Sequence, residues 1–113
     1  IRTFCLRVIR CIDNLEGRID GLDETSETAN HLQEIHDELL FALESSGVEQ
    51  YRPEINSDYR GQEKTAEALK EKDSHGKPEH AGKIAKVVRP GYRYIIDDEN
   101  FKIVRTAQVK LYG

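Results

Sequence analysis

The chain has 113 residues, of which 37% are hydrophobic, and it carries a formal net charge of −4 without any Trp or Met. This length suffices for one modest domain or two very small modules, and the thin apolar content favours oligomerisation to complete a core. The sequence contains no run of eighteen apolar residues and no signal peptide, which argues against a membrane span. It opens at Ile1 inside a periodic pattern, and we interpret it as a fragment whose natural N-terminus is missing.

The first predicted element is a helix over residues 1–22. Its apolar side chains recur at alternating steps of four and three, as in a heptad seam. The seam consists of Ile1, Cys5, Val8, Ile12, Leu15, Ile19 and Leu22. The stripe is widened by Phe4, Leu6, Ile9 and Cys11, as expected for a helix in a bundle with more than one neighbour. Cys5 and Cys11 would lie about 9 Å apart along the helix axis, too far for a disulfide, so we expect two free thiols and a cytoplasmic location.

A second helix is predicted to begin at Thr25 or Ser26, whose hydroxyls can cap it, and to end at Gly47. Its predicted buried face holds Ala29, Leu32, Ile35, Leu39, Ala42 and Leu43. A short connection between two helices favours an antiparallel hairpin, and two hairpins from two chains would form a four-helix bundle. Residues 1–47 are therefore expected to form a helical dimerisation region with a coiled-coil seam.

The periodicity changes after Gly47, and residues 48–113 are expected to form a small all-β head domain, which makes the chain an α+β protein. The predicted strands cover residues 48–51, 83–89, 92–96, 101–104 and 107–112, the last four as a β-meander. Pro90 and Gly91 fit the centre of a type II turn, and residues 97–100 fit a polar hairpin loop. Residues 64–72 suit either a short strand or one helical turn, whereas residues 54–63 and 73–81 resemble loops.

Charge is distributed unevenly along the chain. Residues 1–47 carry four basic and ten acidic side chains, a balance of −6, whereas residues 82–113 carry seven basic and three acidic ones, a balance of +4. A locally basic head suits an acidic partner surface, nucleic acid included. Tyr92, Tyr94 and Phe101 lie among these cations, a combination that can bind single-stranded nucleic acid, but we favour charges that simply solubilise the outer face of the strands.

The sequence contains no pattern that supports catalysis, a cofactor or a metal site. His31 and His36 are five positions apart and would not share one face of a helix, so we interpret both as ordinary surface histidines. His75 and His80 lie in a predicted loop with too few companions for a metal ion. The acidic residues 97–99 lack the alternating ligands and turn glycine of a calcium loop. We therefore expect a protein that acts by binding and is not an enzyme.

Four segments, taken in their order and spacing, resemble the GrpE family, the nucleotide exchange factors of DnaK-type chaperones. Residues 12–16 look like the family's Asp-Asn-Leu-Glu element, and residues 40–49 look like its helix exit into a Gly-Val-Glu strand. Residues 82–93 resemble its Gly-x-Val…Lys-Gly-Tyr segment, and residues 102–109 resemble its closing Arg-x-Leu-Arg-Pro-Ala-x-Val strand. Together these segments span most of the chain.

The resemblance implies a homodimeric co-chaperone of protein folding and the stress response, with no cofactor of its own. One β-head of the dimer would bind the nucleotide-binding domain of a DnaK-type chaperone, open its cleft and promote ADP release. The positions that match chaperone contacts are Val88, Lys102, Arg105 and Leu111, of which Arg105 is either a contact or a structural residue. The matching dimer interface comprises Val8, Ile12, Leu15, Ile19, Leu32, Ile35 and Leu39.

Two alternatives stay open at this point. Residues 59–66 depart from the family's Phe-Asp-Pro-x-x-His-Glu-Ala segment, and Thr106 stands where Pro is usual. A GrpE-like scaffold or adaptor without exchange activity is therefore the first alternative. A single-stranded nucleic-acid-binding module that uses the basic head is the second and less favoured one.

Overall fold

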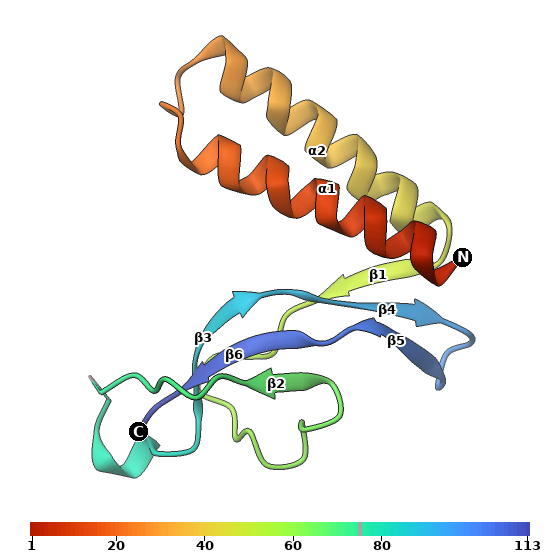
Figure 1. The fold of residues 1–113 in the computed structure, drawn as a ribbon. Coiled ribbons are helices and arrows are strands. Elements are labelled where there is room, and N and C mark those ends of the chain that lie inside the picture. Colours follow the sequence, from red (N-terminus) through yellow and green to blue (C-terminus); the bar gives the residue numbers. More distant parts are fainter. Residues whose placement is uncertain (75) are drawn as a thin grey trace. The chain divides into compact units, whose positions relative to one another are not determined.

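The computed structural model describes residues 1–74 and 76–113, so His75 and its predicted loop position lie outside the described residues. The chain divides into two compact units, Ile1–Val48 and Glu49–Gly113. The first unit is helical and the second is built from strands and loops, as the ribbon in Figure 1 shows. The predicted α+β fold class, with a helical region followed by a small β-head, is confirmed.

The helical unit is an antiparallel pair formed by α1 (Arg2–Asp20) and α2 (Glu27–Ser45) (Figure 1). Ser26 caps α2, because its hydroxyl accepts a hydrogen bond from the Ala29 amide at 3.0 Å. Gly47 follows the end of α2 with a φ of 91°, a left-handed conformation that glycine adopts without strain. The structure therefore confirms the predicted start and end of the second helix.

The two helices share a small core. Its buried apolar side chains are Cys5, Ile9, Ile12, Leu15, Ala29 and Leu43. The predicted seam is correct at its centre and wrong at its ends, where Ile1 and Leu22 are exposed. Ile1 precedes the first turn of α1 and Leu22 follows its last residue, so neither side chain is held against α2.

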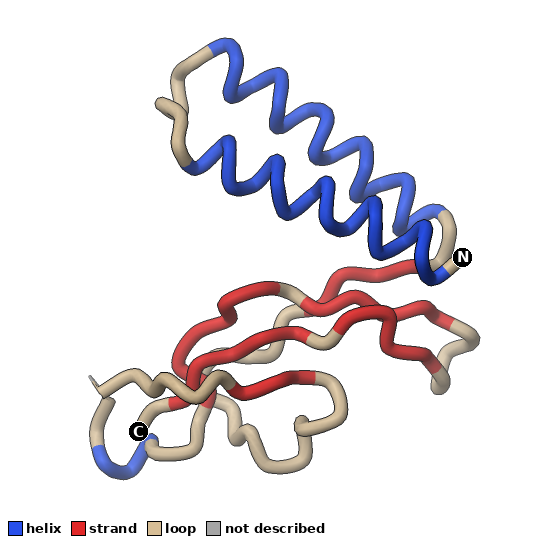
Figure 2. Tube along the Cα trace, viewed as in Figure 1, coloured by secondary structure: helices blue, strands red, loops and turns tan. Residues whose placement is uncertain are grey.

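In the described residues of the head, the strands form two three-stranded sheets (Figure 2). The strands are β1 (Val48–Tyr51), β2 (Ala66–Ala68), β3 (Ile84–Arg89), β4 (Gly91–Ile95), β5 (Phe101–Arg105) and β6 (Ala107–Leu111). In one sheet β4 lies between β1 and β5, and in the other β6 lies between β2 and β3. β6 runs parallel to β2 and antiparallel to β3, and β4 runs antiparallel to β5.

The predicted β-meander is wrong, because β3 pairs with β6 and not with β4. The reason lies in the alternation of β6, in which every second side chain is buried. These side chains join one core cluster that consists of Ala66, Ile84, Ala107, Val109 and Leu111. Ala66 comes from β2 and Ile84 from β3, so both neighbours of β6 contribute to the same core as its buried face.

The predicted type II turn at Pro90 and Gly91 is also wrong. Gly91 has no positive φ and is the first residue of β4, so the chain passes directly from the second sheet to the first at this point. A Cβ atom added to Gly91 would overlap the ring of Tyr51. Glycine is therefore required here for the close approach of an aromatic side chain and not for a turn.

The remaining segments follow the predictions more closely. The residues between 64 and 72 form a strand, β2, rather than a helical turn, and the described part of the 73–81 loop contains a short 3₁₀ helix, η1 (Pro78–His80). The predicted hairpin loop is confirmed, since Asp97 Oδ1 accepts hydrogen bonds from the Glu99 and Asn100 amides at 2.9 Å. Within the described ranges, none of the helices combines the length and apolar character that crossing a membrane demands.

Candidate functional site

One side of the helical hairpin is apolar beyond the shared core. Side chains that follow one another at steps of three and four residues lie on the same flank of a helix. Each residue turns the helix by about 100°, and this rotation places one apolar flank of α1 and one of α2 beside the shared core, on the same side of the antiparallel pair. The residues of this apolar side are Phe4, Val8, Cys11 and Leu15 on α1, and Leu32, Ile35, Leu39 and Ala42 on α2. Phe4 is 70% exposed and Ile35 is 48% exposed, so the apolar side has surface that a partner helix can cover.

Most of the residues predicted for the dimer interface lie in the shared core or on the apolar side, whereas Ile19 lines the recess beside Glu16 and His36. Ile12 is completely buried and Leu15 nearly so, within a single chain. Val8, Ile19, Leu32 and Leu39 are half-buried. Packing inside the hairpin thus explains why position 12 is apolar, whereas the exposed part of Ile35 could be covered by a second chain. Phe4 and Cys11, which were predicted to widen the apolar stripe but were not included in the predicted interface, are both exposed and are spaced by seven residues, as in a heptad.

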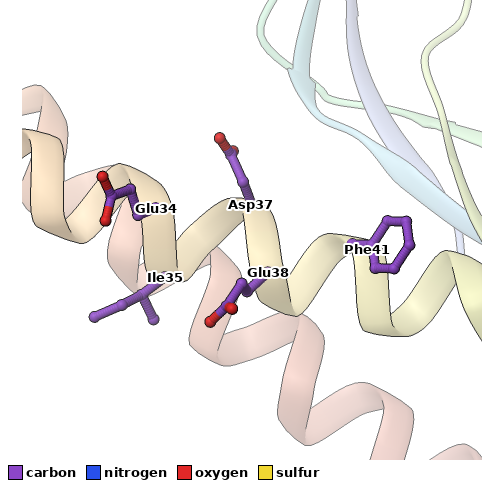
Figure 3. A pocket seen from close by; sticks show the side chains of 5 residues that line it. All are labelled: Glu34, Ile35, Asp37, Glu38 and Phe41. Carbon is purple, nitrogen blue, oxygen red and sulfur yellow. The ribbon is translucent and has the colours of Figure 1, made fainter.

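The outer face of α2 is acidic and carries one exposed aromatic ring. Figure 3 shows a shallow depression lined by Glu34, Ile35, Asp37, Glu38 and Phe41. Phe41 is 69% exposed among these carboxylates. The face opposes the core face of the same helix, so its charges solubilise the outside of the hairpin.

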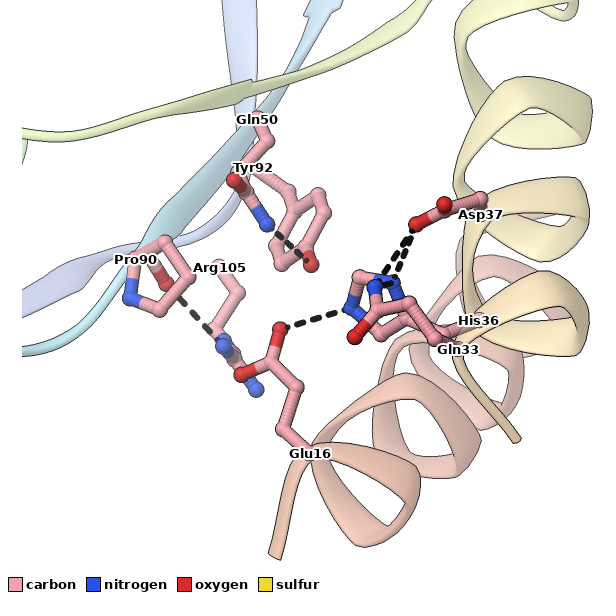
Figure 4. Close-up of polar contacts among 8 residues, drawn as sticks. All are labelled: Glu16, Gln33, His36, Asp37, Gln50, Pro90, Tyr92 and Arg105. Carbon is pink, nitrogen blue, oxygen red and sulfur yellow. Dashed lines mark hydrogen bonds and ion pairs between the residues drawn. The ribbon is translucent and has the colours of Figure 1, made fainter. Parts of the chain in front are cut away.

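The two helices α1 and α2 are also joined by polar contacts, drawn in Figure 4. His36 Nε2 lies 2.9 Å from Glu16 Oε1, and His36 Nδ1 lies 3.0 Å from Asp37 Oδ1. Gln33 Nε2 donates to the same Asp37 oxygen at 2.9 Å. His36 is only 9% exposed, so its interpretation as a surface histidine is wrong, whereas His31 is indeed exposed.

These contacts change the acidity of the groups that make them. Burial disfavours the charged imidazole, but the hydrogen bonds to Asp37 and Glu16 and their negative charges outweigh burial, so the pKa of His36 is raised above its ordinary value of 6.5. The hydrogen bonds from His36 and Gln33 lower the pKa of the Asp37 carboxyl. The sequence signal for this cluster is that Gln33 and His36 are spaced by three residues beside the apolar positions of α2.

In the head, the β4–β5 hairpin exposes a cation beside apolar surface. Tyr94 on β4 lies directly opposite Lys102 on β5, so the two side chains share one face of the sheet. Lys102 is exposed, Tyr94 is 41% exposed, and Ile96 just beyond β4 is 52% exposed. An exposed ammonium group with aromatic and aliphatic neighbours suits a partner surface that combines a carboxylate with an apolar patch.

The opposite face of the same hairpin is occupied by contacts within the head. The guanidinium carbon of Arg93 lies 5.4 Å from the ring centroid of Tyr51 and 5.1 Å from that of Phe101. Arg93 Nη2 also donates to Glu49 Oε1 at 2.6 Å. Arg93 is therefore a structural cation, and Lys102 is the more accessible charge of this hairpin.

Of the four residues predicted to contact a chaperone, Val88 and Lys102 are exposed, whereas Arg105 is half-buried and Leu111 is buried. Lys102 lies on β5 in the first sheet, whereas Val88 is exposed on β3 in the second sheet. Leu111 is 8% exposed and belongs to the core cluster of the head. Arg105 Nη2 donates to the Pro90 carbonyl at 3.0 Å, and its guanidinium lies 5.3 Å from the centroid of the Tyr92 ring (Figure 4). The geometry of Arg105 thus favours the structural one of its two predicted roles.

Possible metal ligands are not gathered anywhere in residues 1–74 and 76–113, where no group of three or more His, Cys, Asp or Glu side chains could hold an ion. Cys5 is buried, Cys11 is exposed, and both are free thiols, as predicted. That the chain uses no cofactor and catalyses no reaction stays a prediction.

The family model of GrpE matches residues 1–112, which is nearly the whole chain. None of the curated proteins compared with the chain matches it significantly.

Proposed function

Because the chain belongs to the GrpE family and is thus a GrpE-like co-chaperone, we propose that it is a dimeric nucleotide exchange factor of a DnaK-type chaperone. Its head would bind the nucleotide-binding domain of the chaperone, open the nucleotide cleft and promote the release of ADP. The observation that carries this proposal is the family match over residues 1–112. The exposed Lys102–Tyr94 pair on the β4–β5 hairpin supports it by offering an accessible contact.

Exchange of this kind requires differential binding and no reactive group. A protein that binds the open, nucleotide-poor chaperone more tightly than the closed one shifts the population toward the open state. The coupling is reciprocal, so bound nucleotide weakens the affinity of the chaperone for the exchange factor by the same factor. A chain that acts through binding surfaces alone satisfies this requirement, and we propose that it is not an enzyme.

Dimerisation is proposed through the apolar side of the helical hairpin. Its half-buried and exposed residues include Val8, Leu32, Ile35 and Leu39 from the predicted interface, joined by Phe4. Two such sides facing each other would bury the remaining apolar surface in a four-helix bundle. The free thiols of Cys5 and Cys11 fit the reducing cytoplasm, where we place the protein.

A nucleotide-release assay tests the proposal. An excess of the protein is added to the chaperone loaded with a fluorescent ADP analogue, and the release rate is measured. We expect acceleration by the wild type, and a roughly tenfold weaker binding for Lys102→Glu, which corresponds to ~1.4 kcal/mol. Lys86→Glu, at an exposed lysine on β3, is the matched control. If the folded dimer does not accelerate release at any concentration, the exchange function is refuted.

The scaffold without exchange activity is the second candidate. Its motivation is the divergent 59–66 segment, which is fixed inside the head because the Tyr59 hydroxyl donates to the Ala66 carbonyl at 2.9 Å. Tyr59 also packs against the core cluster, so the segment has a structural role in this chain. Chaperone binding without accelerated release would favour this candidate over the first.

A single-strand nucleic-acid binder is the third candidate and receives less support. Several cations of the head are engaged within the head itself, namely Arg93 with Glu49, Arg105 with Pro90, and Lys110 with Glu71 at 3.6 Å. Fewer charges are then available for phosphates. Binding of an oligonucleotide that weakens steeply with salt would support this candidate, and no binding at low salt would eliminate it.

A further inference from the structure

His36 occupies an unusual position between the two helices of the hairpin. Its imidazole is buried, and each ring nitrogen faces a carboxylate oxygen, from Glu16 on α1 at 2.9 Å and from Asp37 on α2 at 3.0 Å (Figure 4). Glu16 and His36 are twenty residues apart in sequence, so their contact joins one helix to the other. The family match alone does not assign any role to this contact.

Two ring nitrogens that each face a carboxylate favour the charged form of the imidazole. A neutral imidazole has one N–H donor and one acceptor nitrogen, whereas an ionised carboxylate can only accept hydrogen bonds. A neutral His36 could donate from Nε2 to Glu16 and accept from Gln33 Nε2, which lies 3.3 Å from Nδ1, but its Nδ1 lone pair would then face the Asp37 carboxylate. Only the imidazolium form, with both nitrogens protonated, donates to Glu16 and Asp37 at the same time.

The other groups around the imidazole reinforce this conclusion. In the helical unit the recess beside the ring is lined by Glu16, Ile19 and Asp20 from α1, and by Gln33 from α2. The titratable groups that face His36 are thus the acids Glu16 and Asp20 on α1 and Asp37 on α2. Gln33 donates to Asp37 and holds its carboxylate against the ring.

We propose that His36 is a pH-sensitive latch, which joins α2 to α1 through Glu16 most strongly while it is protonated and weakens this joint when it loses its proton. The action of the latch concerns the stability of the hairpin and does not depend on whether the chain exchanges nucleotide.

The direction of the pH effect follows from linkage. Burial opposes the charge on His36, but its two carboxylate partners prevail, so the pKa of His36 is higher in the folded chain than the 6.5 of the unfolded one. The stabilisation is complete below the unfolded pKa and is lost as the pH rises through the folded pKa. The folded hairpin is therefore expected to weaken above pH 6.5, at the alkaline side of the histidine range.

The first experiment measures the titration of His36 by NMR in the full chain. We expect a midpoint above 6.5 that falls when Glu16→Gln removes the carboxylate on α1. A midpoint of His36 at or below 6.5 in the wild type would overturn the proposal. This measurement does not require any variant to be stable.

The second experiment follows urea unfolding by circular dichroism at 222 nm between pH 5.5 and 8.5, at one fixed protein concentration. For each unit by which the NMR midpoint exceeds 6.5, the unfolding equilibrium constant of the wild type should rise about tenfold across the window. The rise should be absent in His36→Gln and retained in His31→Gln, the control at an exposed histidine of the same helix. An equal rise in His36→Gln would show that other groups cause it and would refute the latch.

Discussion

Replacing Ile35 with alanine tests whether the apolar side of the hairpin is the dimer interface. The side chain loses three carbon groups, each worth about 0.8 kcal/mol when it is fully removed from water. Ile35 is 48% exposed in the single chain, so roughly half of this sum is gained within the chain and half is left for a partner. The free energy gained when a partner chain covers the exposed half of Ile35 is about 1.2 kcal/mol per chain, or about 2.4 kcal/mol for a symmetric dimer that buries two copies.

This energy converts into a measurable change in affinity. A loss of about 2.4 kcal/mol raises the dimer dissociation constant roughly 50-fold. Sedimentation equilibrium over a range of concentrations would measure this constant for the wild type and for Ile35→Ala. The helical signal at high concentration should stay close to that of the wild type, because the shared core of the hairpin lies elsewhere.

Ile55→Ala provides the matched control for this prediction. Ile55 lies in the head unit and is 44% exposed, so it offers the same chemistry at nearly the same exposure. We expect its dissociation constant to equal that of the wild type. An unchanged constant for Ile35→Ala, with the fold intact, would refute the reasoning and remove Ile35 from the interface.

Three further predictions concern the stability of each unit. Gly91→Ala should destabilise the head by about 1–3 kcal/mol, because the new Cβ overlaps the Tyr51 ring. Thermal unfolding followed by tyrosine absorbance measures this loss of stability, and an unchanged unfolding midpoint would contradict the close approach of the ring to Gly91. Ser26→Ala should cost the hairpin about 1 kcal/mol through the lost cap, read from urea unfolding at 222 nm against Ser45→Ala as the control. Arg105→Lys should lower the stability of the head by about 1 kcal/mol, because lysine cannot both stack on the Tyr92 ring and keep the hydrogen bond to the Pro90 carbonyl. A loss of chaperone affinity without a loss of stability would instead show that Arg105 contacts the chaperone.

The helical half of the fold could be predicted from the sequence because its determinants are local. Ser26 and Gly47 act within a few residues of themselves, and a heptad pattern specifies which flank of a helix is buried. The hairpin loop at residues 97–100 belongs to the same class, since Asp97 bonds only to its immediate neighbours. Such features need no knowledge of the rest of the chain.

The strand pairing could not be predicted, because it depends on segments that are distant in sequence. β6 pairs in parallel with β2, with Ala107 opposite Ala66. The sequence of neither strand indicates which segment it pairs with. Pro90 and Gly91 have the composition of a turn, but the ring of Tyr51, forty residues earlier, determines what Gly91 does. His36 was misjudged for the same reason, since its partner Glu16 lies twenty residues away on the other helix.

The order of the strands also bears on how the protein is made. β6 is the central strand of its sheet and the last strand in the chain, so β2 and β3 have no neighbour to pair with until residues 107–111 have left the ribosome. The helical hairpin depends on contacts within the first 48 residues and can form while the head is still being synthesised. During translation the chain would therefore pass through a state with folded helices and two open strand edges, a state that is itself exposed to aggregation.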